Sequence, residues 1–309
     1  MSGRRDVFPL VPRQRLLGLS FGVIHGIRRG LGTDVAGSRP YRPGDDRDTI
    51  DWAATARLSA ARASAEFVVR EHYADDAPRV VIVVDRRPEM ALSSPDVPWL
   101  RKHEALRTAA RLIADSVAEA RGLVGYLDLA EGADEPFWRP PSSNRELWSI
   151  RDEHLRHATY AAPEDNLTLA LEFLESHRRA VPGGTFLFVI SDFLVSPPRE
   201  VWERAIEHRW DVVPLVIQDP LWEQSFPPVD GIVVPLTGAD GRVRLVRLRA
   251  GESDERRREH EQRRADLVDG FLELGVDPVM LSSSEHDHVL AALLDWAAGR
   301  ELEHGRNWR

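Results

Sequence analysis

The sequence predicts an α/β fold built on a doubly wound, mostly parallel sheet. Residues 80–84 are five consecutive β-branched residues, which is typical of a strand buried on both faces. A second apolar run of strand length covers residues 185–190. From residue 80 onward, such runs alternate with segments of helical periodicity, and this alternation favours parallel strands joined by helices.

The remaining elements follow from local patterns and turn residues. Before the first core strand we expect a helical turn near 50–57 and a strand over 65–70. After it we expect the following: helix 99–120, strand 123–129, an edge strand near 136–140, helices 144–157 and 166–180, strand 185–192, helix 199–208 and strand 211–217. A hairpin insertion (231–236 and 243–248, with turn 238–241), helix 254–274 capped by Ser253, strand 276–281 and helix 285–298 complete the chain.

Two regions are expected, an N-terminal extension over residues 1–75 and the α/β domain over residues 76–303.

The 309 residues carry a net charge of −9 and include no cysteine, which excludes disulfides and thiolate chemistry. No apolar run approaches the ~20 residues of a membrane span, and residues 1–15 lack the apolar segment of a signal peptide. We therefore expect a cytoplasmic protein with no direct membrane span, and the absence of a nucleic-acid-binding motif predicts no nucleic-acid partner.

Carboxylates follow two of the expected core strands. Asp85 comes directly after residues 80–84, and Asp192 ends the run that begins at residue 185. The carboxyl ends of parallel strands meet at one edge of the sheet, where α/β proteins place their ligand sites. The two aspartates therefore predict a shared polar crevice, which is the first candidate for function.

Two sets of residues resemble known families. Asp85 after the first core strand and Ile190-Ser191-Asp192 at the end of a later one resemble the von Willebrand factor A fold. Upstream, the stretch Arg39-Pro40-Tyr41-Arg42-Pro43-Gly44-Asp45-Asp46, then Ile50-Asp51-Trp52 and Ala56-Arg57, resembles the signature of the bacterial domain-of-unknown-function family fifty-eight. Two departures are present. Asp48 stands where the family has an arginine, and the N-terminal membrane helices of many members are missing.

The resemblance implies a position for a divalent cation. Von Willebrand factor A domains hold one with Asp-x-Ser-x-Ser after the first strand, a threonine on a second loop and an aspartate after a later strand. Matched position by position, the resemblance assigns these ligands to Asp85, Arg87, Glu89, Asp165 and Asp192. All three hydroxyl positions are therefore changed.

Three arrangements of this altered site are possible. An internal pair can form, with the guanidinium of Arg87, or of Arg86 after a one-residue shift, at the cation position against Asp85 or Asp192. Alternatively, both arginines point to solvent and Asp85 caps the next element. The third arrangement is a magnesium or calcium ion bound by carboxylates alone. We favour the internal pair and therefore expect no cofactor.

The signature also has two interpretations. Asp45 and Asp46 can build a turn while Trp52 fills core. Alternatively, the signature is a partner-binding surface, which would comprise Arg39, Tyr41, Pro43, Gly44, Asp45, Asp46, Asp51, Trp52 and Arg57. Near the C-terminus, residues 285–288 (Glu-His-Asp-His) could ligate a metal, but Ser284 with Asp287 favours a capping box.

The family resemblance implies a role beside MoxR-type AAA+ ATPases. We expect an adaptor or co-chaperone that links such an ATPase to client proteins and has no catalytic residues of its own. One rival function is a metal-dependent ligand-binding domain that uses the carboxylate-rich site. A second rival is a hydrolase that uses the acidic crevice, which would require well-separated pKa values among its carboxylates.

Overall fold

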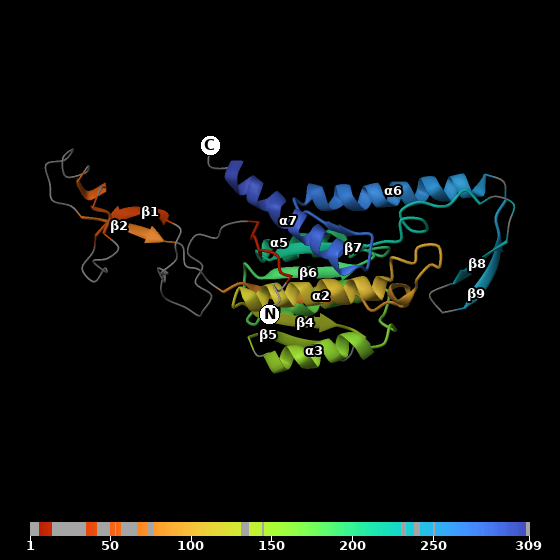
Figure 1. The fold of residues 1–309 in the computed structure, drawn as a ribbon, viewed down its shortest axis with the longest axis horizontal. Coiled ribbons are helices and arrows are strands. Elements are labelled where there is room, and N and C mark those ends of the chain that lie inside the picture. The colour runs from red at the N-terminus through yellow and green to blue at the C-terminus, as the bar shows by residue number, and fades with distance from the viewer. Residues whose placement is uncertain are drawn as a thin grey trace. The chain divides into compact units, whose positions relative to one another are not determined.

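Two units make up the chain in a computed structural model (Figure 1). The structure describes residues 6–13, 35–41, 50–52, 54–56, 67–72, 77–130, 136–143, 145–229, 231, 233–237, 242–249 and 251–306. Unit 1 comprises residues 1–13 and 78–309, and unit 2 comprises residues 14–77. The expected N-terminal extension over residues 1–75 is therefore wrong at its start, because residues 1–13 belong to unit 1. Phe8 and Val11 are buried in the core of unit 1, where Phe8 packs edge-to-face on Phe188.

A six-stranded sheet forms the centre of unit 1, in the order β10-β7-β6-β3-β4-β5. β3 pairs in parallel with both neighbours, as the β-branched run predicts, and all other pairs except β4–β5 are also parallel. The antiparallel β5 lies at the edge, where its two prolines cost no ladder bond on the open side. The bounds are β3 (Arg79–Val84), β4 (Leu123–Asp128), β5 (Phe137–Ser142), β6 (Phe186–Ser191), β7 (Asp211–Ile217) and β10 (Val279–Leu281).

Helices cover both faces of the sheet (Figure 1). Val80, Ile82 and Val84 belong to a core shared with α2, α3 and α7, whereas Val81 and Val83 belong to a core shared with α4, α5 and α6. This alternation follows from the two-residue period of a strand and confirms the doubly wound α/β class. The bounds are α2 (Lys102–Glu119), α3 (Arg145–His157), α4 (Asn166–Ser176), α5 (Arg199–Glu207), α6 (Glu252–Glu273) and α7 (His286–Arg306). Within the described ranges, none of these helices combines the length and apolarity of a membrane span.

Several expected boundaries need correction. α6 begins after Gly251, whose φ of 82° is accessible to glycine, so Ser253 lies inside the helix rather than at its cap. α4 ends at Ser176, four residues early, and α7 continues to Arg306, eight residues beyond its expected end. The hairpin of β8 (Val233–Thr237) and β9 (Val243–Arg247) forms as expected. Its turn, residues 238–241, lies outside the described residues.

Unit 2 contains a second two-stranded sheet. β1 (Val35–Pro40) pairs antiparallel with β2 (Val68–His72), and Ile50 bridges Val69 of β2. Helical backbone follows Asp51, whose Oδ1 accepts a hydrogen bond from the Ala54 amide at 2.9 Å. Asp51 therefore acts as the N-cap of this helical segment, a position where aspartate is strongly preferred.

Replacing Val83 by Asp should unfold unit 1, because the side chain is fully buried at the centre of the sheet and an unpaired carboxylate there costs at least about 3 kcal/mol. Val233→Asp is the matched control, because Val233 lies on β8 and is 52% exposed. Circular dichroism during heating should show a cooperative transition in the parent and the control only. A Val83→Asp protein with the parent's midpoint would contradict the central placement of β3.

Candidate functional site

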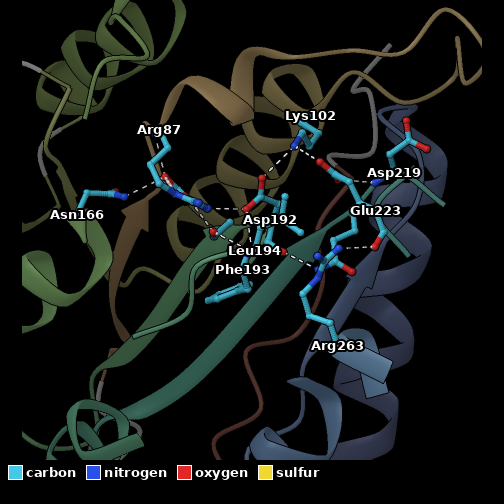
Figure 2. A network of polar contacts seen from close by, with 12 residues as sticks. Arg87, Lys102, Asn166, Asp192, Phe193, Leu194, Asp219, Glu223 and Arg263 are labelled. Carbon is cyan, nitrogen blue, oxygen red and sulfur yellow. Dashed lines mark hydrogen bonds and ion pairs between the residues drawn. The ribbon is translucent and has the colours of Figure 1, made fainter. Parts of the chain in front are cut away.

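Arg87 lies between the two aspartates that follow β3 and β6. Its Nη2 atom is 2.7 Å from Asp85 Oδ2 and 2.5 Å from Asp192 Oδ1, and its Nε donates to Asp85 Oδ2 at 3.0 Å. All three side chains are at most 3% exposed. The guanidinium thus joins the ends of two adjacent parallel strands (Figure 2).

Asp85 accepts further hydrogen bonds from neighbouring elements. Ser191 Oγ donates to its Oδ2 at 2.6 Å, and Asn166 Nδ2, at the start of α4, donates to its Oδ1 at 3.1 Å. The Arg87 backbone amide donates to Oδ1 at 2.9 Å. The carboxylate is therefore fully surrounded by donors, which is the condition under which a charged group can be buried.

A second cation extends the cluster toward the loop after β7. Lys102 is the only lysine of the chain and the first residue of α2. Its Nζ lies 2.9 Å from Asp192 Oδ2 and 2.6 Å from Glu223 Oε1 (Figure 2). Glu223 in turn accepts the Asp219 backbone amide at 2.8 Å. We call Asp85, Arg87, Lys102, Asp192 and Glu223 the crevice cluster.

The loop after β6 aims Asp192 into this cluster. Phe193 has a φ of 51°, a left-handed backbone that is unusual for a bulky residue. The resulting turn brings the Phe193 amide to Ser191 Oγ at 2.9 Å and the Leu194 amide to Asp192 Oδ1 at 3.0 Å. Asp192 is therefore fixed by the Leu194 backbone amide as well as by the two cations.

The charges of the cluster shift one another's pKa values. Burial alone would raise the pKa of Asp192, but Lys102 and Arg87 outweigh burial and hold this pKa below its usual range. Burial alone would lower the pKa of Lys102, but Asp192 and Glu223 outweigh it and the pKa is raised. Burial raises the pKa of Glu223, even beside Lys102. The cluster thus stabilises ionised Asp192 and charged Lys102.

Two of the expected site residues do not take part in this network. Asp165 is exposed at the N-cap of α4, and the neighbouring Asn166, the first residue of α4, reaches Asp85 in its place. Glu89 is half-buried on the short 3-10 helix η2 (Pro88–Ala91), and among the described residues its side chain makes none of the cluster's contacts. Of the four carboxylates that the resemblance assigns to the cation site, only Asp85 and Asp192 therefore take part, and the third carboxylate of the cluster is Glu223.

Arg86 belongs to a separate buried network. Its Nε donates to Asp128 Oδ2 at 2.9 Å and its Nη2 to the Tyr126 hydroxyl at 3.1 Å, while His154 Nε2 lies 3.0 Å from Asp128 Oδ2. Arg86 and Arg87 point to opposite sides because successive residues of an extended chain do so. The alternative in which both arginines extend into solvent is wrong, since both are buried.

The crevice cluster does not fit a divalent cation. The Arg87 guanidinium stands where a cation shared by Asp85 and Asp192 would bind, and Lys102 takes the remaining oxygen of Asp192. A divalent ion there would meet two positive groups and carboxylates that are already paired. Across the described ranges, no three His, Asp or Glu side chains are grouped as a metal site would need.

Only some of the signature residues lie within the described part of the chain. Tyr41 and Trp52 each make an edge-to-face contact with Phe67. The expectation that Trp52 fills core is wrong, because its side chain is 64% exposed and Phe67 is 44% exposed. Pro43, Gly44, Asp45, Asp46 and Arg57 lie outside the described residues, as does the side chain of Arg39.

The C-terminal acidic and histidine residues disperse rather than converge. His286 Nε2 contacts Asp6 Oδ2 at 3.0 Å, whereas His288 Nδ1 lies 3.1 Å from Glu285 Oε2. The Ser284 hydroxyl donates to the Trp99 carbonyl at 2.9 Å, so the expected capping box is also wrong. Ser283 Oγ accepts the Glu285 amide instead.

The fold and the cluster define a doubly wound α/β protein whose crevice is neutralised internally by arginine and lysine. Residues 37–266 match the family described as "Protein of unknown function DUF58", a span of more than half the chain, so the chain belongs to DUF58.

Relatives and similar structures are distant. The chain is 27% identical over 296 residues to Uncharacterized protein Rv1480 of Mycobacterium tuberculosis and to Uncharacterized protein Mb1516 of Mycobacterium bovis. Each alignment covers 94% of this chain and 87% of the relative. Among solved structures, BatB from Bacteroides thetaiotaomicron is 16% identical with a TM-score of 0.42, covering 72% of this chain and 99% of that one. An aerotolerance-related membrane protein from Bacteroides fragilis is 15% identical with a TM-score of 0.41, covering 70% and 96%.

Replacing Lys102 by Met should lower the free energy of unfolding by about 3–5 kcal/mol at pH 7, because the buried charge of Asp192 would lose one of its two cationic partners and Glu223 would lose its buried donor. Lys102 has a raised pKa, so its contribution is complete below pH 10.5 and is lost as pH rises through the folded value. Asp192 has a lowered pKa, so its contribution is present above pH 3.8 and is lost as pH falls through the folded value. The effect should therefore be largest between these limits.

Urea denaturation at several pH values measures this effect. Arg101→Met is the control, because Arg101 is the adjacent residue and its ion pair with Glu104 is exposed. The control should change the free energy of unfolding by no more than about 1 kcal/mol. Equal losses in the two variants would show that Lys102 is not the buried counter-charge of the cluster.

Proposed function

We propose that this chain is a non-catalytic protein-interaction module, an adaptor or co-chaperone that works with a MoxR-type AAA+ ATPase on client proteins. The observation that carries the proposal is the internal neutralisation of the crevice, in which Arg87 and Lys102 engage the carboxylates that either rival function would need. The choice of ATPase rests on the family resemblance. The proposal places the complex in the cytoplasm, where ATP is available to the partner.

The two rival functions, a metal-dependent ligand-binding domain and a hydrolase, need carboxylates that are already paired in the crevice. A metal-dependent ligand site needs Asp85 and Asp192 as ligands, and both are paired with Arg87. A hydrolase needs a carboxyl group that can exchange protons near neutral pH. Asp192 is buried with a lowered pKa, and Glu223, whose pKa is raised, is held by Lys102 at 2.6 Å. The arrangement therefore favours a structural role for these charges.

The exposed aromatic residues of unit 2 supply a candidate contact surface. Trp52 and Phe67 are 64% and 44% exposed and meet edge-to-face at 6.0 Å, and Tyr41 also meets Phe67 edge-to-face. Large aromatic side chains dominate the binding energy of protein interfaces, because they bury much area at low entropic cost. In this proposal, Trp52 and Phe67 contact the ATPase.

Co-purification with a MoxR-type ATPase of the same organism tests the proposal. The purified chain should hydrolyse no ATP alone, but it should bind the ATPase and change its rate of ATP turnover. Trp52→Ala with Phe67→Ala should weaken binding at least about tenfold, since each residue is of the type that forms interface hot spots.

Trp99→Ala provides the matched control, because Trp99 is 49% exposed but lies in unit 1. Its affinity for the ATPase should equal that of the parent. A parent chain that neither binds the ATPase nor alters its turnover would refute the adaptor role. Equal affinity of the aromatic double variant and the parent would refute the assignment of the surface.

A further inference from the structure

The hairpin of β8 and β9 forms a small sheet of its own. The two strands pair antiparallel, and in the described part of the chain neither of them pairs with any other strand. Figure 1 shows the hairpin beyond the N-terminal end of α6, away from the six-stranded sheet. Because a two-stranded sheet has no inner strand, each of its strands is an edge to which another strand can be added.

One face of the hairpin is packed and the other is exposed. On the packed face, Leu248 is buried and Val246 is half-buried beside Phe226. Leu245 belongs to the opposite face, because successive residues of a strand alternate, and its side chain is 74% exposed. The register places Val233, which is 52% exposed, on the same face as Leu245. Two apolar side chains therefore lie uncovered on one short hairpin.

Positive charge accompanies these apolar side chains. Residues 242–249 include four arginines and no acidic residue, although the whole chain has a net charge of −9. The four are exposed: Arg242, Arg244, Arg247 and Arg249. The first two carboxylates downstream are matched by arginines of α6 itself, since Glu252 lies 2.9 Å from Arg256 and Asp254 lies 3.4 Å from Arg257. β9 is therefore an exposed strand that is both apolar and basic.

The two strands of the hairpin differ as templates for a further strand. Pro235 in β8 has no N–H group, which blunts that edge. β9 contains no proline, so its backbone can pair with an added strand through main-chain hydrogen bonds. Such a strand would run beside Leu245 and Arg247. Apolar and acidic side chains would complement these two residues, whereas basic side chains would be repelled.

We propose that the outer edge of β9 binds an extended acidic segment of another protein as an added strand. Apolar residues of the segment cover Leu245, and its carboxylates lie against Arg247. The proposal rests on the adaptor role only in assigning the segment to a client protein. Its test requires no ATPase, so a failure of one proposal leaves the other intact.

Fluorescence anisotropy of the full chain with a short labelled peptide that alternates glutamate and valine tests the site. The salt concentration is about 0.15 M, at which charge effects beyond about 8 Å are largely screened. The peptide should bind with saturation. Two other peptides should bind at least about tenfold more weakly. One has the same sequence with an N-methylated backbone, which keeps its charge but cannot donate to a strand, and the other alternates lysine and valine.

Three outcomes would overturn the proposal. The first is no saturable binding of the glutamate–valine peptide with the chain at about 100 μM. The second is equal binding of the N-methylated peptide, which would mean that no strand is added. The third is saturable binding of a single-stranded RNA in place of the peptide, which would make the basic strand a nucleic-acid site.

Variants of β9 locate the bound peptide. Arg247→Glu should weaken binding at least about tenfold, because it reverses the charge that faces the glutamates. Its matched control is Arg178→Glu, since Arg178 is an exposed arginine in the turn after α4. Leu245→Thr keeps a residue that favours strands but removes apolar contact, and it should weaken binding at least about threefold. Its matched control is Leu302→Thr, because Leu302 of α7 is 70% exposed.

Both controls should bind like the parent. All four positions are exposed, so every variant should keep the parent's circular dichroism spectrum. Unchanged binding by either β9 variant would place the peptide elsewhere and overturn the proposal.

Discussion

The crevice depends on the guanidinium of Arg87, which holds two buried aspartates together. Asp85 and Asp192 follow neighbouring parallel strands, so the topology itself brings their negative charges close. Without a cation between them, burial and mutual repulsion would oppose their ionisation. Arg87 contacts both, and Lys102 adds a second positive charge that connects α2 to Asp192 and Glu223. The carboxyl ends of β3 and β6 are thereby held together by charged side chains of the chain itself.

This internal pairing bears on how the protein acts. A crevice whose carboxylates are already satisfied offers little to an incoming metal or to acid–base chemistry, and its ion pairs add rigidity to the surrounding loops. In the proposed adaptor role, recognition of a partner would therefore be carried by other surfaces. The exposed aromatic pair of Trp52 and Phe67 in unit 2 is the surface proposed for this contact, and it lies within the segment that matches DUF58.

The sequence was most informative where one strong local pattern decided the structure. Five β-branched residues sufficed to predict the central strand, and the aspartates after two strands predicted the crevice. The contribution of Lys102 could not be predicted, because 90 residues separate it from Asp192 and no local pattern connects them. Asn166 was missed by one position: the start of α4 was predicted correctly, but the family match assigned the threonine position to Asp165, and no local pattern shows which of the two side chains turns toward Asp85. The sequence left Trp52 either in the core or on a partner-binding surface, because its exposure depends on neighbours that residue type does not reveal.

Magnesium titration by calorimetry tests the role of Arg87 most directly. The parent chain should give no saturable heat, whereas Arg87→Ser should bind magnesium, because the substitution removes the competing charge and adds a hydroxyl beside Asp85, Ser191 and Asp192. Arg86→Ser is the matched control: it removes the neighbouring buried guanidinium, which pairs with Asp128 rather than with the crevice cluster, and it should bind no magnesium. Tight magnesium binding by the parent, or none by a folded Arg87→Ser protein, would contradict the claim that Arg87 takes the place of a metal ion.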